Sequence, residues 1–193
     1  MRRTSPERRR RILDATIALA SSGGFEAVQM RAVAERADVA LGTLYRYFPS
    51  KIHLLVSALA REFERANAGF ERKPVPGDLR ADRVMHVLTR LTATLQSEPD
   101  LTEALTRAFM FADSSVSEEI HAVAEQLSRM LLRAMSGAPE GADAPPSTDE
   151  EVAIAKVIGD VWLASLVQWV TGRATAADVD RSMDVAVRLL LRD

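Results

Sequence analysis

The sequence predicts an all-helical protein of about nine helices. Apolar residues recur at three- and four-residue spacing along most of the chain. Short stretches rich in glycine, proline and serine separate the segments that carry these repeats. At 193 residues and 47% apolar content, the chain can bury a sizeable core. We expect an N-terminal domain over residues 1–53 and a C-terminal helical domain over residues 54–193, with a connecting helix over about 50–69.

The charges are distributed unevenly, and this points to two different partners. The net charge is −2, but residues 1–53 hold ten Lys and Arg against five Asp and Glu, whereas the remaining residues carry a net charge of −7. A basic front on an otherwise acidic protein is typical of nucleic-acid binding. The N-terminal domain is therefore expected to bind DNA.

Composition also excludes several classes of protein. The absence of cysteine excludes disulfides, thiolate metal sites and cysteine nucleophiles. No run approaches eighteen uninterrupted apolar residues, and no apolar segment follows the basic N-terminus. We therefore expect neither a transmembrane span nor a signal peptide, and a cytoplasmic location.

The first helix is predicted to begin at Ser5-Pro6-Glu7, where a cap, a first-position proline and an early acid follow one another. It should end at Gly23-Gly24. The arginines at positions 8–11 lie in its opening, within reach of a duplex backbone or the adjacent minor groove. A solvated basic tail is the alternative.

The next two helices are predicted to form a helix-turn-helix. Residues 28–38 carry apolar residues at helical spacing and break at Asp38. In the following segment, over residues 39–51, Leu44 and Phe48 share an inner face and leave polar and aromatic side chains outward. Pro49 should stop this helix and Ser50 should cap the next. Lys51 then lies in the first turn, where its ammonium and the free backbone N–H groups are expected to bind a phosphate.

This region resembles the DNA-binding domain of TetR-family transcriptional regulators over roughly residues 8–60. The resemblance rests on Phe25-Glu-Ala-Val, Val33-Ala-Glu-Arg-Ala-Asp-Val and Gly42-Thr-Leu-Tyr-Arg-Tyr-Phe-Pro-Ser-Lys in this order. It implies that the DNA-contacting residues are Gln29, Arg31, Leu41, Gly42, Thr43, Tyr45, Arg46, Tyr47 and Lys51. Arg46 suits bidentate recognition of guanine, and Leu41 and Thr43 suit thymine methyl groups. Tyr45 and Tyr47 have packing within the domain as their alternative role.

The remaining helices follow from the same periodicity. The helix that starts at Ser50 should connect the two domains, and residues 73–78 should link it to the next helix. Further helices are predicted from Ala81 to about Ser97, over 101–112, over 120–134, after the cap at Thr148, and after the cap at Thr175. Residues 137–148 contain three prolines and no apolar anchor, which predicts a mobile loop.

The segment from 149 to 170 is apolar on nearly every face, so it needs cover from its own core and from another subunit. With the last helix, whose apolar stripe includes Leu190, it could close a four-helix interface between two chains. Burial within its own domain alone is the alternative. The family resemblance implies a homodimer through these two helices. Asp160 is expected to be a satisfied core acid or an interface pair rather than a ligand contact.

A ligand pocket is predicted between the C-terminal helices, because large adaptable apolar side chains gather there. The candidates are Met85, Leu88, Phe109, Met110, Phe111, Met130, Trp162, Leu166 and Trp169. Ordinary core packing is the alternative for each of them. If the effector carries phosphate groups, Arg107 and Arg173 are the candidate side chains to bind them.

Within the family, residues 23–34 and 51–59 resemble actinobacterial repressors of sterol catabolism. This implies a ligand-responsive homodimeric repressor that binds a palindromic operator and is released by a steroid-derived acyl-coenzyme A thioester, with no other cofactor. A regulator that responds to fatty acyl-coenzyme A or to a drug, and a non-responsive architectural DNA binder, are the alternatives. An enzyme is not expected, because His53, His86 and His121 lack metal-ligand spacing and no nucleophile motif accompanies them. We therefore predict neither catalytic residues nor a metal site.

Overall fold

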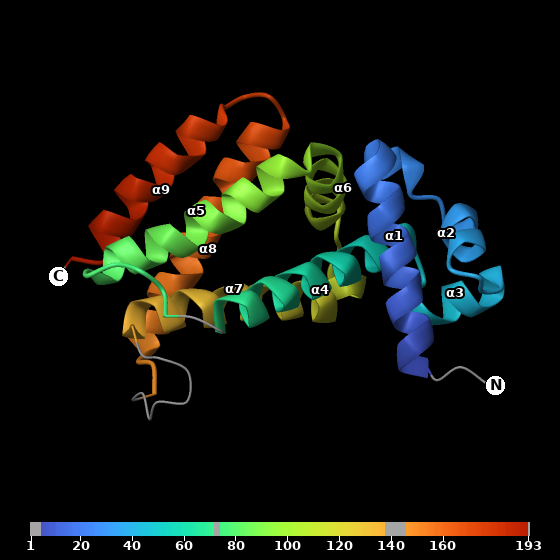
Figure 1. The fold of residues 1–193 in the computed structure, drawn as a ribbon, viewed down its shortest axis with the longest axis horizontal. Coiled ribbons are helices and arrows are strands. Elements are labelled where there is room, and N and C mark those ends of the chain that lie inside the picture. The colour runs from blue at the N-terminus through green and yellow to red at the C-terminus, as the bar shows by residue number, and fades with distance from the viewer. Residues whose placement is uncertain (1–4, 72–73, 138–145, 193) are drawn as a thin grey trace. The chain divides into compact units, whose positions relative to one another are not determined.

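The fold is helical throughout the part of the chain that the computed structural model describes, residues 5–71, 74–137 and 146–192 (Figure 1). Within these ranges there are nine α-helices, one short 3-10 helix and no strand, which confirms the predicted fold class. The elements are α1 (Ser5–Ala27), α2 (Met30–Arg36), α3 (Leu41–Tyr47), α4 (Lys51–Glu71), α5 (Arg80–Ser97), α6 (Pro99–Met110), η1 (Ser114–Val116), α7 (Ser117–Ser136), α8 (Asp149–Val170) and α9 (Ala176–Leu190).

The chain forms two compact units. The first contains the described residues up to Arg61 together with Glu98–His121, and the second contains Glu62–Ser97 and the chain from Ala122 onward. The predicted domain boundary between residues 53 and 54 stays a prediction. The two compact units do not follow this boundary, because α6, which is distant in sequence, packs against α1 and belongs to the first unit (Figure 1).

The core of the first unit is built from the inner faces of α1 to α4. Its largest fully buried side chains are Ile12, Leu13, Val28, Leu44, Phe48, Leu54 and Leu55. The regular part of α1 breaks at the double glycine where its end was predicted, but after this kink, at which Gly24 has a φ of +63°, α1 continues to Ala27. A side chain at Gly24 would be strained by this φ, and its Cβ would lie 3.0 Å from Glu103 Oε2 of α6. The kink therefore allows α6 to approach α1 closely.

The second unit is a helical bundle closed by aromatic packing. Trp162 of α8 is buried, its ring meets Phe63 of α4 edge-on with centroids 6.1 Å apart, and its indole N–H donates to Thr92 Oγ1 of α5 at 2.9 Å. A buried indole needs such a partner, since an unpaired N–H in an apolar interior is costly. Helix α9 packs against both α8 and α5.

Both predicted caps in this unit are confirmed as capping boxes. The Thr148 hydroxyl accepts from the Glu151 backbone N–H, and the Glu151 carboxylate accepts from Thr148 N in return. Thr175 and Asp178 repeat this arrangement at α9. These bonds satisfy backbone N–H groups that the first helical turn leaves without a partner. Most of the predicted mobile loop, residues 138–145, lies outside the described residues.

Arg83 of α5 joins the end of α7 to the segment before α5. Its Nε and Nη2 donate to the carbonyl oxygens of Ala134 and Met135 at 2.7 and 3.0 Å. Its Nη1 donates to the carbonyl oxygens of Gly77 and Asp78 at 3.2 and 3.0 Å. Arg83 thus satisfies carbonyl groups at the C-terminus of α7, where the helix offers no backbone donor.

Candidate nucleic-acid interface

Helices α2 and α3 are joined by a tight turn at Asp38, whose φ of 52° is left-handed. Asparagine and aspartate adopt this conformation more readily than other non-glycine residues. The turn is held by backbone bonds from Asp38 N to Glu35 O at 3.1 Å and from Val39 N to Ala34 O at 3.0 Å. The predicted helix-turn-helix is therefore present in the structure.

Helix α3 presents one face to solvent and buries the other. Leu44 is fully buried, and Phe48 is 1% exposed although it follows the last helical residue and has an extended backbone. Leu41 and Tyr45 are 40% and 46% exposed, Gly42 and Arg46 are also exposed, and Thr43 and Tyr47 are half-buried. The alternative that Tyr45 packs in the core is thus wrong. The outward face therefore carries Leu41 and Arg46, two of the three residues that the sequence predicted for base contacts.

The start of α1 meets the end of α3. Ser5 Oγ and the Tyr47 hydroxyl share a hydrogen bond at 2.9 Å, and the Arg9 guanidinium lies 5.5 Å from the centroid of the Phe48 ring. The bond with Ser5, and then the nearby positive charge of Arg8, lower the pKa of Tyr47 below its usual value. Arg8 and Arg9 of α1 therefore lie on the same side of the unit as the end of α3.

Gln29 and Arg31 flank the first residue of α2, and both are exposed. Arg31 makes only a long ion pair with Glu35, at 3.7 Å, and both side chains are largely in solvent. Exposed pairs of this kind contribute little to stability. Among the described residues, this weak pair is the contact that Arg31 would have to give up to reach a phosphate.

Lys51 lies in the first turn of α4, behind the predicted cap. Ser50 Oγ accepts from His53 N at 3.3 Å, which confirms Ser50 as the cap. The Lys51 ammonium lies 3.7 Å from the centroid of the Phe25 ring. Burial lowers the pKa of Lys51, and the nearby Glu26 carboxylate opposes this effect. Lys51 therefore lies at the start of α4, and its contact with the Phe25 ring restricts the side chain.

The candidate ligand residues are divided between the two units. In the second unit Leu88, Met130, Trp162 and Leu166 are buried, and Met85 and Trp169 are half-buried. In the first unit Phe109 is half-buried, whereas Met110 and Phe111 are exposed. Arg107, also in the first unit, pairs with Glu26 at 3.1 Å and Glu103 at 3.5 Å. Their roles in ligand binding stay predictions, and Arg107 would have to leave these acids to bind a phosphate.

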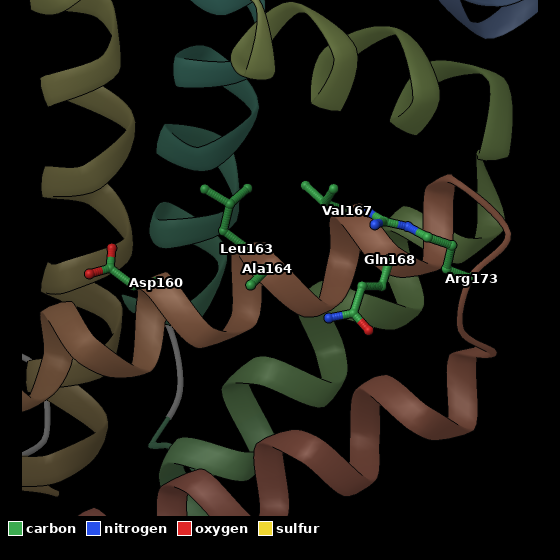
Figure 2. Close-up of a pocket in the computed structure, with 6 residues that line it drawn as sticks. All are labelled: Asp160, Leu163, Ala164, Val167, Gln168 and Arg173. Carbon is green, nitrogen blue, oxygen red and sulfur yellow. The ribbon is translucent and has the colours of Figure 1, made fainter.

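Asp160 corrects one expectation. It is not a core acid, because its side chain is 64% exposed and pairs with Lys156 one turn earlier at 2.6 Å. It lies at the edge of a shallow groove of about 530 Å³ along α8. Figure 2 shows the groove residues, which are Asp160, Leu163, Ala164, Val167, Gln168 and Arg173. The groove shares none of the predicted apolar ligand residues.

Helices α8 and α9 each leave apolar side chains uncovered. Val152 and Val157 of α8 are 46% and 44% exposed, and Val185 and Leu189 of α9 are 59% and 56% exposed. Helix α8 has a length and composition that membrane spans share with the core helices of soluble proteins, and 28% of its most apolar stretch is buried within the chain. The alternative that these helices bury their apolar residues only in their own domain is therefore wrong for these four side chains.

Some residues of the site were not foreseen from the sequence. Phe25, Glu103 and Ser115 contact the start of α4 or its neighbours, and the contacts of Glu103 and Ser115 depend on packing between distant segments. The one local signal for Phe25 is its place directly after the double glycine, where a break in the helix is expected. Within the described ranges, no group of three or more His, Asp or Glu side chains is placed to hold a metal ion.

Comparison with known proteins assigns both parts of the chain. Residues 12–58 match the bacterial regulatory proteins of the tetR family, and residues 77–190 match the tetracyclin repressor-like C-terminal domain. The chain is 56% identical over 187 residues to the HTH-type transcriptional repressor KstR of Rhodococcus jostii, covering 97% of this chain and 84% of that protein.

Solved structures share the whole fold. A TetR transcriptional regulator from Rhodococcus sp. RHA1 superposes with a TM-score of 0.85 at 31% identity, with 97% of each chain covered. The repressor FadR of Thermus thermophilus, solved in complex with lauroyl-CoA, gives a TM-score of 0.70 at 19% identity, with 95% of this chain and 93% of that chain covered.

Proposed function

The chain belongs to the TetR family of bacterial DNA-binding transcriptional regulators, and from this premise we propose that it represses genes of sterol or related lipid catabolism. It binds a palindromic operator as a homodimer in the cytoplasm, and a steroid-derived acyl-coenzyme A thioester releases it. The observation that carries this proposal is the 56% identity with KstR, which extends through the C-terminal domain as well as the helix-turn-helix.

The interior of the second unit supports an apolar effector. Leu88, Met130 and Leu166 supply buried apolar surface, and the Trp162–Thr92 pair supplies a polar group within it. A fused ring system would suit a cavity between these side chains, because apolar contact provides affinity and a few polar groups fix orientation. The same fold holds lauroyl-CoA in the Thermus thermophilus protein. The exposed Arg173 of the same unit is the candidate for the coenzyme A phosphates.

The apolar residues left uncovered on α8 and α9 support a homodimer through these two helices. A second copy of the same surface would cover Val157 and Leu189 with matching apolar groups around a two-fold axis. The two-fold axis would also present two copies of α3 to the two halves of a palindrome.

Arg46→Ala is expected to relax sequence preference rather than abolish binding. Arg46 is exposed on α3, and removal of a bidentate hydrogen bond to guanine costs about 1–3 kcal/mol at that base pair. The measurement is the affinity for a set of duplexes that differ from the preferred site by one base pair. An equal loss for every duplex would show that Arg46 contacts phosphate instead.

The effector is tested by its coupling to DNA. Addition of a steroid acyl-coenzyme A thioester to the protein–operator complex should lower the fluorescence anisotropy of the labelled DNA. Operator DNA should weaken thioester binding by the same factor, because the coupling free energy is reciprocal. A fatty acyl-coenzyme A and a hydrophobic drug serve as comparison ligands, and release by one of these alone would assign a different effector. Unchanged anisotropy at saturating thioester, with binding to the protein confirmed by calorimetry, would favour the architectural alternative.

A further inference from the structure

Two cations and one aromatic ring meet at the junction of α1, α4 and α6 within the first unit. The Lys51 ammonium and the Arg107 guanidinium lie 3.7 and 4.4 Å from the centroid of the Phe25 ring. Cations are attracted to the face of an aromatic ring, most strongly where water is partly excluded. Lys51 is only partly exposed, so the ring restricts a side chain that would otherwise sample many rotamers.

Glu103 of α6 holds the ring in place through the backbone. Its Oε2 accepts a hydrogen bond from the Phe25 backbone N–H at 3.0 Å, directly after the glycine kink of α1. Its Oε1 lies 3.5 Å from Arg107 Nη1, and Glu26 pairs with the same nitrogen at 3.1 Å. The two carboxylates balance the charges of Lys51 and Arg107, which would otherwise repel each other.

A second contact ties the chain after α6 to the same end of α4. His53 Nε2 lies 3.0 Å from the carbonyl oxygen of Ser115, and because a carbonyl only accepts, Nε2 carries the proton. His53 Nδ1 lies 2.9 Å from the hydroxyl of Ser50, the residue that caps α4. Residues of the α6–η1 segment therefore hold both the cap and the first-turn lysine of α4.

We propose that Glu103 and Arg107 of α6 are positioning residues for DNA binding, which act through the Phe25 ring to hold Lys51 where it contacts a DNA phosphate. The inference rests on the proposed function, because it takes Lys51 as a phosphate contact at the start of α4. Residues of α6 would then raise the affinity for the operator without contacting the DNA themselves.

The test is a thermodynamic cycle between Phe25 and Lys51. The probe is a fluorescein-labelled duplex selected from a random library by binding to the wild-type protein, and anisotropy is measured over a series of KCl concentrations. Phe25→Leu keeps an apolar side chain but removes the ring face, and should lower affinity about threefold to tenfold. The slope of log affinity against log salt should become shallower by about 0.9 for each phosphate that is no longer neutralised, and Lys51→Met should do the same.

In the Lys51→Met background, Phe25→Leu should have no further effect on affinity or on salt slope. Glu103→Gln retains an oxygen that accepts from the Phe25 N–H and should keep most of the affinity, whereas Glu103→Ala should behave like Phe25→Leu. Arg107→Met should weaken binding in the same way. The matched control is Arg129→Met, an exposed α7 arginine that pairs with Glu125 on its own helix, and it should leave affinity and slope unchanged.

A loss on Phe25→Leu that persists in full without Lys51, or that leaves the salt slope intact, would show that the ring is merely structural and overturn the inference. An unchanged affinity for Lys51→Met would also overturn it, while leaving operator recognition by α3 in place. If the wild-type protein selected no duplex, the proposed function itself would fail. Circular dichroism melts of every variant separate these outcomes from loss of fold.

Discussion

Leu189→Glu is expected to convert the homodimer into a monomer that no longer holds its operator. In the single chain Leu189 is 56% exposed and Val185, one turn earlier, is 59% exposed, so a carboxylate at either position is compatible with the fold of α9. In a two-fold interface the same carboxylate would be buried without a partner in both copies, and each burial costs several kcal/mol. Light scattering after size-exclusion chromatography should report the mass of one chain.

Operator affinity should fall together with the mass. One helix-turn-helix offers half of the phosphate and base contacts, and the second binding event loses the advantage of being tethered to the first. Phe111→Glu is the matched control, because Phe111 is 65% exposed and lies just after α6 in the first unit, which contains neither α8 nor α9. If Leu189→Glu remained a dimer, the interface would have to lie on another surface.

Helical periodicity alone does not identify Leu189 as the exposed leucine of α9. The apolar stripe of α9 includes Leu190, yet Leu190 is half-buried against its own unit and Leu189 faces outward. A change at Leu190 would disturb the monomer as well as the dimer. Helical spacing identifies which residues are apolar and how they recur, but a difference of one position depends on how the neighbouring helices pack.

The elements that were predicted well are encoded over a few residues. The cap at Ser50 and the capping boxes at Thr148 and Thr175 each depend on a side chain that bonds within three positions, and the turn at Asp38 is held by backbone bonds to Glu35 and between Val39 and Ala34. The outward face of α3 follows from the burial of Leu44 and Phe48 four residues apart. Such signals are present in the sequence whatever the rest of the chain does.

The features that were missed depend on contacts between distant segments. Glu103 and Phe25 are 78 positions apart, and no local pattern indicates that a carboxylate of α6 will accept the N–H of α1. The short helix η1 and the packing of α6 with α1 were missed for the same reason. Asp160 was expected to be a satisfied core acid or an interface pair because its neighbours are apolar, and the core alternative is wrong, since Asp160 lies on the face of α8 that the single chain leaves in solvent.

Arg83→Ala is expected to lower the free energy of unfolding of the second unit by roughly 3 kcal/mol. Hydrogen bonds from a charged donor contribute about 1.5–3 kcal/mol each when partly buried, and the four that Arg83 makes are not additive. Loss of the guanidinium leaves the carbonyls of Ala134 and Met135 without this donor at the end of α7, and the segment at Gly77 and Asp78 loses its attachment.

The two tryptophans make this measurement specific, because Trp162 and Trp169 are the only ones in the sequence and both lie in the second unit. Guanidinium denaturation followed by tryptophan fluorescence, at one fixed protein concentration, therefore reports on the part of the protein that Arg83 holds together.

Arg83→Lys should lie between the wild type and Arg83→Ala, because an ammonium keeps the charge but cannot reach four carbonyls with the planar fork of a guanidinium. Arg129→Ala serves as the control, since its exposed ion pair with Glu125 should contribute less than about 1 kcal/mol. An equal midpoint for Arg83→Ala and Arg129→Ala would mean that water replaces Arg83 at these carbonyls without cost. The segment before α5 would then be held by the packing of α5 itself, where Ala81, Val84 and Leu88 are buried.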